Sequence, residues 1–404
     1  MVLVSAKPGT ICTIVGIGAP SHAGDGGQAI EACLNEPKSL ALDSNGHLYI
    51  ADSENHAIRK VELRTGIITT VAGCPGGLPS PADRQCSPMT TSADLTEEDP
   101  LGCSSQATQE KFAQLADLSG TVRFVVGASP TGGRFRGDGG PASSATLNFP
   151  SAVAVDERGN LYIADAMNHR VRKVDAVTGI ICTVAGTGQR RFSGDGGLAI
   201  AAALNEPVAL AVDHRRHLYI ADQSNNRVRM VDLDTGVMTT VAGTGEATYN
   251  GDGMLASEAA LAGPSGLVVG PDGTVYIADT FNGRIRAVDP ESGLIRTVAG
   301  DGGEYRYQAQ PNEFSTSLSR PYGIALDQTG NIVITDSDNH LIRRWDERKK
   351  IVTRVAGNGM AQFGGDSGPP QESSLNYPFG VAVDQSGNIY IADTFNHRIR
   401  LIVA

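Results

Sequence analysis

Leu161-Tyr162-Ile163-Ala164-Asp165 occurs, with small changes, six times along the chain. The copies end in aspartates at one repeated position: Asp52, Asp165, Asp222, Asp279, Asp336 and Asp393. The last four steps between these aspartates are 57 residues each, and the first step is 113 residues. Because self-similarity at a fixed period is the signature of repeat architectures, the chain is predicted to consist of copies of one structural unit.

Each copy predicts four short strands separated by turns. A proline opens an apolar run, as in 207–213, and the Leu-Tyr-Ile-Ala-Asp strand follows it. An Asp-x-x-Asn turn then leads to a strand that alternates Arg with Val or Ile, as in 170–175, and a Thr-Gly turn leads to the last strand, as in 180–186. The first two strands are apolar on both faces and the third exposes one face, which is the order of strands in a β-propeller blade.

Counting the copies predicts a closed ring. Five copies are complete and the sixth lacks its fourth strand; they occupy approximately residues 35–73, 148–186, 205–243, 263–300, 320–357 and 377–404. An apolar segment within residues 1–16 supplies the missing strand, and its pairing with the last copy removes an open sheet edge. We therefore predict a single all-β domain over 1–404: a six-bladed β-propeller of four-stranded antiparallel blades, whose N-terminal strand closes the last blade.

The turn after each Asp carries a second signature. It reads Asn339-His340-Leu341 in one copy, and the matching positions are Asn55-His56, Asn168-His169 and Asn396-His397, with Asn225-Asn226 and Asn282-Gly283 as variants. These residues resemble the NHL-repeat β-propeller family, whose name reflects such an Asn-His-Leu sequence. The resemblance covers the chain except 74–118. It also implies a fold shared with the lyase that cleaves peptidyl-hydroxyglycine, which needs axial His–metal ligands. Only His22 and His214 lie outside repeated positions here, so no set of three such ligands is expected.

Residues 74–118 interrupt the pattern. They are polar, rich in Pro and Ser, and carry Cys74, Cys86 and Cys103. We predict an inserted loop because the segment lacks both the Pro-led strand and the Tyr-Ile-Ala-Asp strand, although the 113-residue step leaves a decayed seventh blade as the alternative. Two of the three cysteines could form a disulfide, or all three could be reduced thiols, and their spacing matches no zinc motif. Long loops in compact domains tend to be functional or disordered.

Composition restricts the classes of partner and location. The formal net charge is −11, which opposes general nucleic-acid binding. No run of eighteen apolar residues is present, so no transmembrane segment is expected. The first seven residues are too short and weakly apolar for a signal peptide, which leaves the localisation open: soluble, cytoplasmic or part of a larger assembly.

Most of the repeated polar residues are interpreted as structural. The Asp-x-x-Asn corners occur in every copy and suit Asp and Asn as caps of their own turns. A repeated arginine is predicted to brace the blades by pairing with a carboxylate; its copies are Arg59, Arg172, Arg229, Arg286, Arg343 and Arg400. The loops between copies carry an aromatic-x-Gly-Asp pattern, as in 135–138. One carboxylate per loop is too few oxygens for calcium, so neither a metal site nor a cofactor is expected.

Positions at which the copies differ are the candidate site. They flank the proline that opens the first strand, and the residue two places after that proline is always small, so the inner strands are expected to crowd around an axis. We call the ring of variable residues at this end the axial mouth; its candidate binding residues are Glu36, Lys38, Glu206, Arg320, Tyr322, Tyr377 and Phe379. Ligand sites favour such places, so the mouth is predicted to bind a small polar molecule or a peptide, an irregular unused rim being the alternative.

The sequence thus predicts a non-catalytic binding or scaffold protein that presents its faces and the 74–118 insert to a protein partner. No catalytic residues are assigned. A lyase or hydrolase that acts in the axial funnel is the alternative. RNA binding, as in some animal NHL proteins, is a third interpretation, and it would need a basic face. Propellers host many functions, so these interpretations rest on analogy at the level of the fold.

Overall fold

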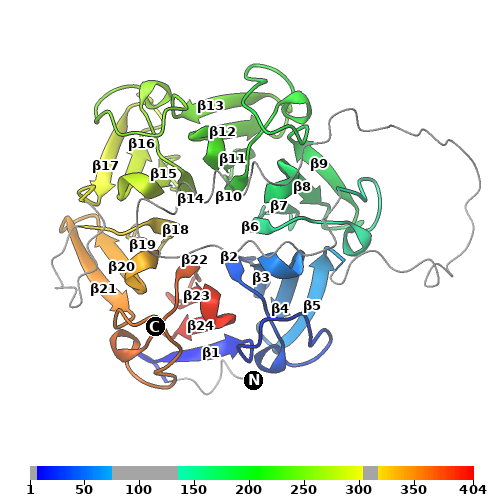
Figure 1. Ribbon diagram of the computed structural model, residues 1–404, viewed down its shortest axis with the longest axis vertical. Helices are drawn as coiled ribbons and strands as arrows, with labels where there is room; N and C mark the ends of the chain where they lie inside the picture. Colours follow the sequence, from blue (N-terminus) through cyan, green and yellow to red (C-terminus); the bar gives the residue numbers. More distant parts are fainter. Residues whose placement is uncertain (1–6, 75–134, 304–316) are drawn as a thin grey trace, which may run out of the picture. The chain divides into compact units, whose positions relative to one another are not determined.

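A computed structural model describes residues 7–74, 135–303 and 317–404. Within this part of the chain, 24 strands form six four-stranded antiparallel sheets, arranged around a centre as blades (Figure 1). We number the blades 1 to 6 in chain order from the first proline-led strand. No helix in these described ranges is long and apolar enough to cross a membrane.

The strands of each blade follow one another from the centre outward. Blade 1 consists of β2 (Pro37–Leu42), β3 (His47–Asp52), β4 (Ala57–Glu62) and β5 (Ile67–Ala72). Blade 2 consists of β6 (Pro150–Val155), β7 (Leu161–Asp165), β8 (Arg170–Val174) and β9 (Ile181–Ala185). Blade 3 consists of β10 (Pro207–Val212), β11 (His217–Asp222), β12 (Arg227–Asp232) and β13 (Met238–Ala242).

The other three blades repeat this order. Blade 4 consists of β14 (Pro264–Val269), β15 (Val275–Asp279), β16 (Arg284–Val288) and β17 (Ile295–Ala299). Blade 5 consists of β18 (Pro321–Leu326), β19 (Ile332–Asp336), β20 (Leu341–Asp346) and β21 (Ile351–Ala356). Blade 6 consists of β22 (Pro378–Val383), β23 (Ile389–Asp393), β24 (Arg398–Ile402) and β1 (Ile11–Val15).

The innermost strands close the ring. They contact one another in the order β2, β6, β10, β14, β18, β22 and back to β2. Since β2 packs directly against β6, blades 1 and 2 are neighbours and the ring closes with six blades. The six-bladed propeller is therefore confirmed, whereas the predicted insert lies, from residue 75 onward, outside the described residues.

The N-terminal strand completes the last blade as predicted. β1 runs antiparallel to β24, with Ile11 opposite Ile402 and Thr13 opposite Arg400, and a bulge separates Thr13 from Val15. Strands far apart in sequence therefore complete one sheet, and the edge of β24 is paired instead of open.

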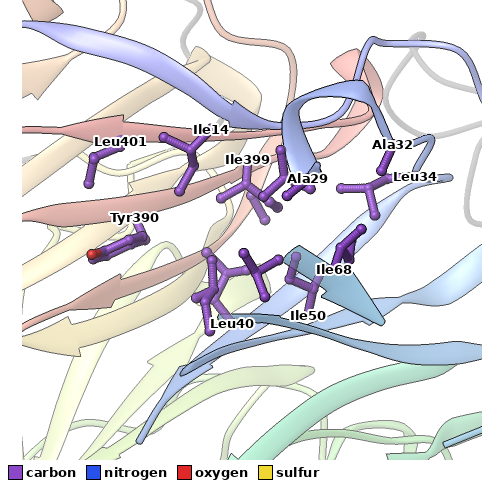
Figure 2. Packing of buried hydrophobic residues seen from close by; sticks show 14 of the residues in the cluster. Ile14, Ala29, Ala32, Leu34, Leu40, Ile50, Ile68, Tyr390, Ile399 and Leu401 are labelled. Atoms are coloured by element: carbon purple, nitrogen blue, oxygen red, sulfur yellow. The ribbon is translucent and has the colours of Figure 1, made fainter. Parts of the chain in front are cut away.

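The core lies between neighbouring blades. Figure 2 shows the cluster between the first and last blades, in which Leu40 and Ile50 of blade 1 face Tyr390 and Leu401 of blade 6. Each sheet packs against a neighbour on both faces, which explains why the inner two strands are apolar throughout. Burial of each large aliphatic side chain stabilises the fold by about 1.5–3 kcal/mol.

Candidate functional site

The corner between the second and third strands of each blade is held by its own residues. In blade 1, β3 ends at Asp52 and is followed by the single turn η2 (Ser53–Asn55). The Asp52 carboxylate accepts hydrogen bonds from the backbone N–H of Asn35 at 2.7 Å and from the Asn55 side chain at 2.8 Å. The Asp-x-x-Asn residues thus satisfy local backbone and each other, as the structural interpretation expects.

The repeated arginine is buried and forms ion pairs with two carboxylates. Arg59 pairs with Asp52 at 3.3 Å in its own blade and with Asp25 at 2.8 Å in the connection that enters the blade. Equivalent pairs of carboxylates hold the arginine in blades 2, 3, 4 and 6: Arg172, Arg229, Arg286 and Arg400. In blade 5, Arg343 pairs with Asp336, and residues 304–316 of the entering connection lie outside the described residues. In the other five blades the arginine therefore ties the entering connection to its blade.

The aromatic-x-Gly-Asp loops pack onto these arginines. The Arg170 and Arg172 guanidinium carbons lie 4.0 and 4.5 Å from the ring centre of Phe135. Asp138 pairs with Arg172 at 2.7 Å and accepts a hydrogen bond from Thr183 at 2.7 Å. The Asp138 carboxylate is thus engaged by two side chains of its blade, although the Asp138 side chain is 35% exposed.

The residue before each opening proline has an uncommon backbone conformation. All six are left-handed, with φ between 47° and 57°: Glu36, Phe149, Glu206, Gly263, Arg320 and Tyr377. Only one of them is glycine, although this conformation disfavours residues with a Cβ atom. The propeller thus presents chemically different side chains on one repeated backbone geometry.

The corner residue of the preceding blade contacts this backbone. The N–H groups of Phe149, Tyr377 and Glu36 donate to Nδ1 of His56, His340 and His397, over 3.1, 3.2 and 3.1 Å. In blade 3 the corner is Asn226, whose side-chain oxygen accepts the N–H of Gly263 at 3.0 Å. The histidines of the Asn-His signature therefore link neighbouring blades at the axial mouth.

Close approach of the inner strands also fits the small residues after the proline. A Cβ atom added to Gly323 would lie 2.2 Å from the carbonyl oxygen of Phe379 in the next blade. Side-chain hydroxyls bridge the same seams: Thr280 donates to the Pro321 carbonyl at 2.8 Å, and Thr394 donates to the Pro37 carbonyl at 2.8 Å. Backbone contacts and side-chain hydroxyl hydrogen bonds thus hold neighbouring blades together around the axis.

The aromatic residues predicted for the axial mouth contact one another in blades 5 and 6. Tyr322 and Phe379 stack with their ring centres 4.5 Å apart and their planes 19° apart. Phe395 contacts both Phe379 and Tyr377, at centre distances of 5.9 and 5.2 Å. Phe395 lies in the turn η12 (Thr394–Asn396), and the sequence analysis did not include it.

The residue directly before Asn in the Asp-x-x-Asn turn is a second variable position of the mouth. Its copies differ in chemistry: Glu54, Met167, Ser224, Phe281, Asp338 and Phe395. Phe395 contacts two predicted mouth residues, as described above. Three other copies each contact one: Ser224 donates to the Glu206 carboxylate at 2.6 Å, Asp338 lies 3.7 Å from Arg320, and the Phe281 ring centre lies 5.4 Å from the Arg320 guanidinium carbon. Variation at this turn position was the sequence signal that could have identified them.

Several carboxyl groups of the mouth have raised pKa values in blades 1 and 5. In blade 1, burial and the nearby Glu36 raise the pKa of Glu54 to about 7, against the opposing effect of Lys38. Burial likewise raises the pKa of Glu36. In blade 5, burial raises the pKa of Asp338 to about 6, while Arg320 opposes that shift.

One interaction spans the mouth. Burial raises the pKa of Tyr322 to about 12, Arg320 acts to lower it, and Glu206 adds to the increase. Glu206 belongs to blade 3 and Tyr322 to blade 5, so this effect acts between residues of two different blades.

Two further predictions concern metals and cysteines. In the described ranges, no group of three or more His, Cys, Asp or Glu side chains could hold a metal ion. Cys74 is half-buried, whereas Cys86 and Cys103 lie outside the described residues. The possible disulfide among these three cysteines therefore stays a prediction.

Sequence comparisons identify relatives of this chain. The family model described as the Teneurin NHL domain matches residues 3–97, 114–193 and 246–289, together more than half of the chain, and the NHL repeat model matches 318–345 and 375–400. The protein SUPPRESSOR OF QUENCHING 1, chloroplastic, of Arabidopsis thaliana is 31% identical over 65% of this chain and 26% of its own length. The human NHL repeat-containing protein 2 is 30% identical over 70% of this chain and 43% of its own length. The chain thus spans less than half of these relatives.

Solved structures share the fold at low identity. A Bacteroides thetaiotaomicron protein described as an auxiliary nutrient binding protein matches with a TM-score of 0.59 and 15% identity, over 97% of this chain and 75% of that one. A Xanthomonas campestris gluconolactonase matches with a TM-score of 0.54 and 13% identity, over 99% and 92%. At these identities the likeness concerns the fold alone.

Proposed function

The chain belongs to the NHL-repeat β-propeller family, and from this premise we propose that it is a non-catalytic binding protein whose axial mouth holds a peptide segment of a protein partner. A small polar ligand would use the same residues. The repeat accounts for the corners, the buried arginines and the loops as structure, so recognition is assigned to the positions at which the copies differ.

One observation carries this proposal: the aromatic cluster of blades 5 and 6 lies on the same rim as charged side chains. Tyr322, Tyr377, Phe379 and Phe395 are in ring contact, and Arg320 and Asp338 belong to the same blade as Tyr322. Aromatic side chains with a few placed polar groups are typical of peptide and ligand sites. The αL backbone shared by the rim residues favours a preformed surface, which lowers the entropic cost of binding.

A phage-displayed library of random peptides, selected on the immobilised full chain, tests this function. Fluorescence anisotropy then compares the selected peptides on the wild type and on Phe395→Ala, with thermal melting to verify that the variant is folded. Val177→Ser is the matched control, because Val177 is 94% exposed in the turn after β8, at the blade end opposite the mouth. We expect Phe395→Ala to weaken binding at least tenfold and Val177→Ser to leave it unchanged. Equal binding to all three proteins would place the site elsewhere.

We also propose that the 74–118 insert contributes to partner binding, because long insertions in compact domains tend to be functional. Replacement of 75–118 by a short Gly-Ser linker is the test. The expected result is weaker capture of a partner already shown to bind the full chain, with an unchanged circular dichroism spectrum. Unchanged capture would remove the insert from the proposal.

A lyase or hydrolase in the axial funnel is the second candidate function, and Glu54 is the observation that favours it. A carboxyl group with a pKa near 7 is suited to general acid–base chemistry, and perturbed carboxyl groups are concentrated at active sites. If the chain turns over a lactone or ester substrate, Glu54→Gln should reduce kcat by at least about a hundredfold. Activity that survives this substitution would exclude Glu54 as the acid or base.

A further inference from the structure

Three corner histidines contact the next blade through the same type of hydrogen bond. His56, His340 and His397 have φ values of 53–55°, and Nδ1 of each accepts a backbone N–H from the residue before the next proline. A neutral imidazole accepts a hydrogen bond at one nitrogen and donates from the other, so each of these rings carries its proton on Nε2. The geometry thus specifies both the charge state and the tautomer.

Protonation removes this bond. A proton taken from water would occupy the Nδ1 lone pair, and Nδ1–H would then face the backbone N–H, donor against donor. The surroundings oppose that step, because burial lowers the pKa of His56 and lowers that of His340 to about 4. Burial also lowers the pKa of His397, with a further contribution from Arg398.

The residues held by these bonds need support. Phe149, Tyr377 and Glu36 have φ values of 49°, 47° and 50°, a left-handed conformation that disfavours residues with a Cβ atom. Two of the imidazoles also touch the side chain that they position: the ring centres of His56 and Phe149 are 4.7 Å apart, and those of His340 and Tyr377 are 4.5 Å apart. Each of these two histidines therefore contacts both the backbone and the side chain of a mouth residue.

We propose that His56, His340 and His397 are positioning residues of the axial mouth, each fixing the mouth residue of the next blade through a neutral Nδ1, so that protonation releases that residue. The positioning role belongs to the free protein. Its consequence, that the mouth binds its ligand best above the titration of these rings, rests on the function proposed above.

Two corners of the chain lack a histidine and serve as internal controls for the proposed role. Asn226 replaces the histidine in blade 3 and accepts the N–H of Gly263 through an oxygen that does not titrate in this range. In blade 4 the corner is Gly283, which has no side chain to offer to Arg320. His169 is a separate case, because the Glu206 N–H approaches its Nδ1 at 3.1 Å and Arg190 approaches its Nε2 at 2.8 Å. A neutral ring accepts only one of these bonds, so His169 is not included in the proposal.

Charged groups adjoin the three rings from both sides of each seam. Glu54 precedes His56 by two residues, and Asp338 precedes His340 by two residues in the same type of turn. Arg398 follows His397, and Glu36 lies across the seam from it. Among these groups, Arg398 lowers the pKa of His397.

Nuclear magnetic resonance of the full free chain tests the proposal without a ligand. The nitrogen resonances of the three rings should identify Nδ1 as the unprotonated nitrogen at pH 7.5. As the pH is lowered within the folded range, the amide resonances of Phe149, Tyr377 and Glu36 should begin to move together with their rings, and that of Gly263 should stay constant. An Nδ1–H tautomer, or movement of Gly263 equal to that of the other amides, would overturn the proposal.

Conservative rescue distinguishes positioning from simple packing. In His397→Ala, hydrogen exchange of the Glu36 amide at pH 7.5 should be about three- to tenfold faster, the effect of losing one hydrogen bond. In His397→Asn, which copies the corner of blade 3, exchange should remain within about twofold of the wild type, because the acceptor is restored. Equal exchange in the Ala and Asn variants would refute the role. Should the Ala variant not fold, the tautomer measurement above still decides, and a failed peptide selection would affect only the function.

Discussion

The backbone N–H of Glu36 donates a hydrogen bond to Nδ1 of His397, which lies 361 residues further along the chain, with 3.1 Å between the two nitrogens. This contact joins the first blade to the last at the axial mouth. The same seam is crossed by the bond from Thr394 to the Pro37 carbonyl and by the apolar cluster of Figure 2. The chain itself also crosses it, because β1 belongs to blade 6 and β2 to blade 1. Ring closure therefore depends on residues from both ends of the sequence.

Removal of residues 1–16 should open this seam. Ile11 and Val15 are fully buried, and loss of their burial alone should lower the free energy of unfolding by at least about 3 kcal/mol. The edge of β24 would also become available to other chains, so we expect self-association. Thermal unfolding and size-exclusion chromatography measure both effects, with removal of residues 1–6 as the control. A truncated 17–404 chain that is monomeric and as stable as the control would contradict the role of β1.

Substitution of a buried arginine should strongly lower the free energy of unfolding. Arg229 has no exposed surface and pairs with Asp195 at 2.6 Å and Asp222 at 3.5 Å. Arg229→Met leaves the Asp222 carboxylate buried without its cation, and this should cost about 3–5 kcal/mol in urea unfolding. Arg64→Ala is the control, because that arginine is 83% exposed in its pair with Glu62 and should cost less than about 1 kcal/mol. Adding Asp222→Asn to Arg229→Met should recover part of the loss, and no recovery would argue against the charge explanation.

Acid should destabilise the propeller through its corner histidines. Burial lowers the pKa of His340 to about 4 in the folded state, whereas the unfolded value is near 6.5. The unfolded chain therefore binds the proton first, and the stability contributed by neutral His340 is complete above pH 6.5 and is lost as the pH falls toward 4. At pH 5 the loss amounts to about 2 kcal/mol. Urea unfolding of the wild type and of His340→Asn at pH 7.5 and pH 5 measures it; the two proteins should differ in pH dependence, and parallel curves would refute the assignment.

At Glu54 we expect the opposite dependence of stability on pH. Burial and Glu36 raise the pKa of this carboxyl group to about 7, so the folded state disfavours its ionised form. The stability that accompanies the neutral form is complete below the unfolded pKa near 4.3 and is lost as the pH rises through 7. Glu54→Gln should therefore raise the melting temperature at pH 8 and change it little at pH 5, with Glu291→Gln in an exposed turn as the control. An equal change at both pH values would show that Glu54 has an ordinary pKa.

The sequence predicted the fold well because each blade encodes it independently. The 57-residue period, the Pro-led strand and the Asp-x-x-Asn turn recur together, so an error in one copy is corrected by the others. The missing fourth strand of blade 6 and the apolar segment before residue 16 could be matched for the same reason. No such redundancy exists for residues 75–118, which occur once.

The candidate site was predicted only in part. Tyr322, Tyr377 and Phe379 could be selected because they vary at a repeated position, and the structure brings them together. Phe395 and Glu54 were missed because the Asp-x-x-Asn turn was interpreted as structural along its whole length, although the residue directly before Asn varies. The acceptor role of His397 could not be inferred from sequence, since it depends on which ring nitrogen faces Glu36 across a seam.

The most direct measurement of the central claim is a hydrogen-exchange footprint of a library-selected peptide bound to the full chain. The account predicts slower exchange at the axial mouth, in 36–38, 320–322, 377–379 and the turn at 394–396, with no change in the turn at 175–180 at the opposite end of blade 2. Protection confined to 175–180 or the other turns of that end, with the mouth unchanged, would contradict the axial mouth as the binding site.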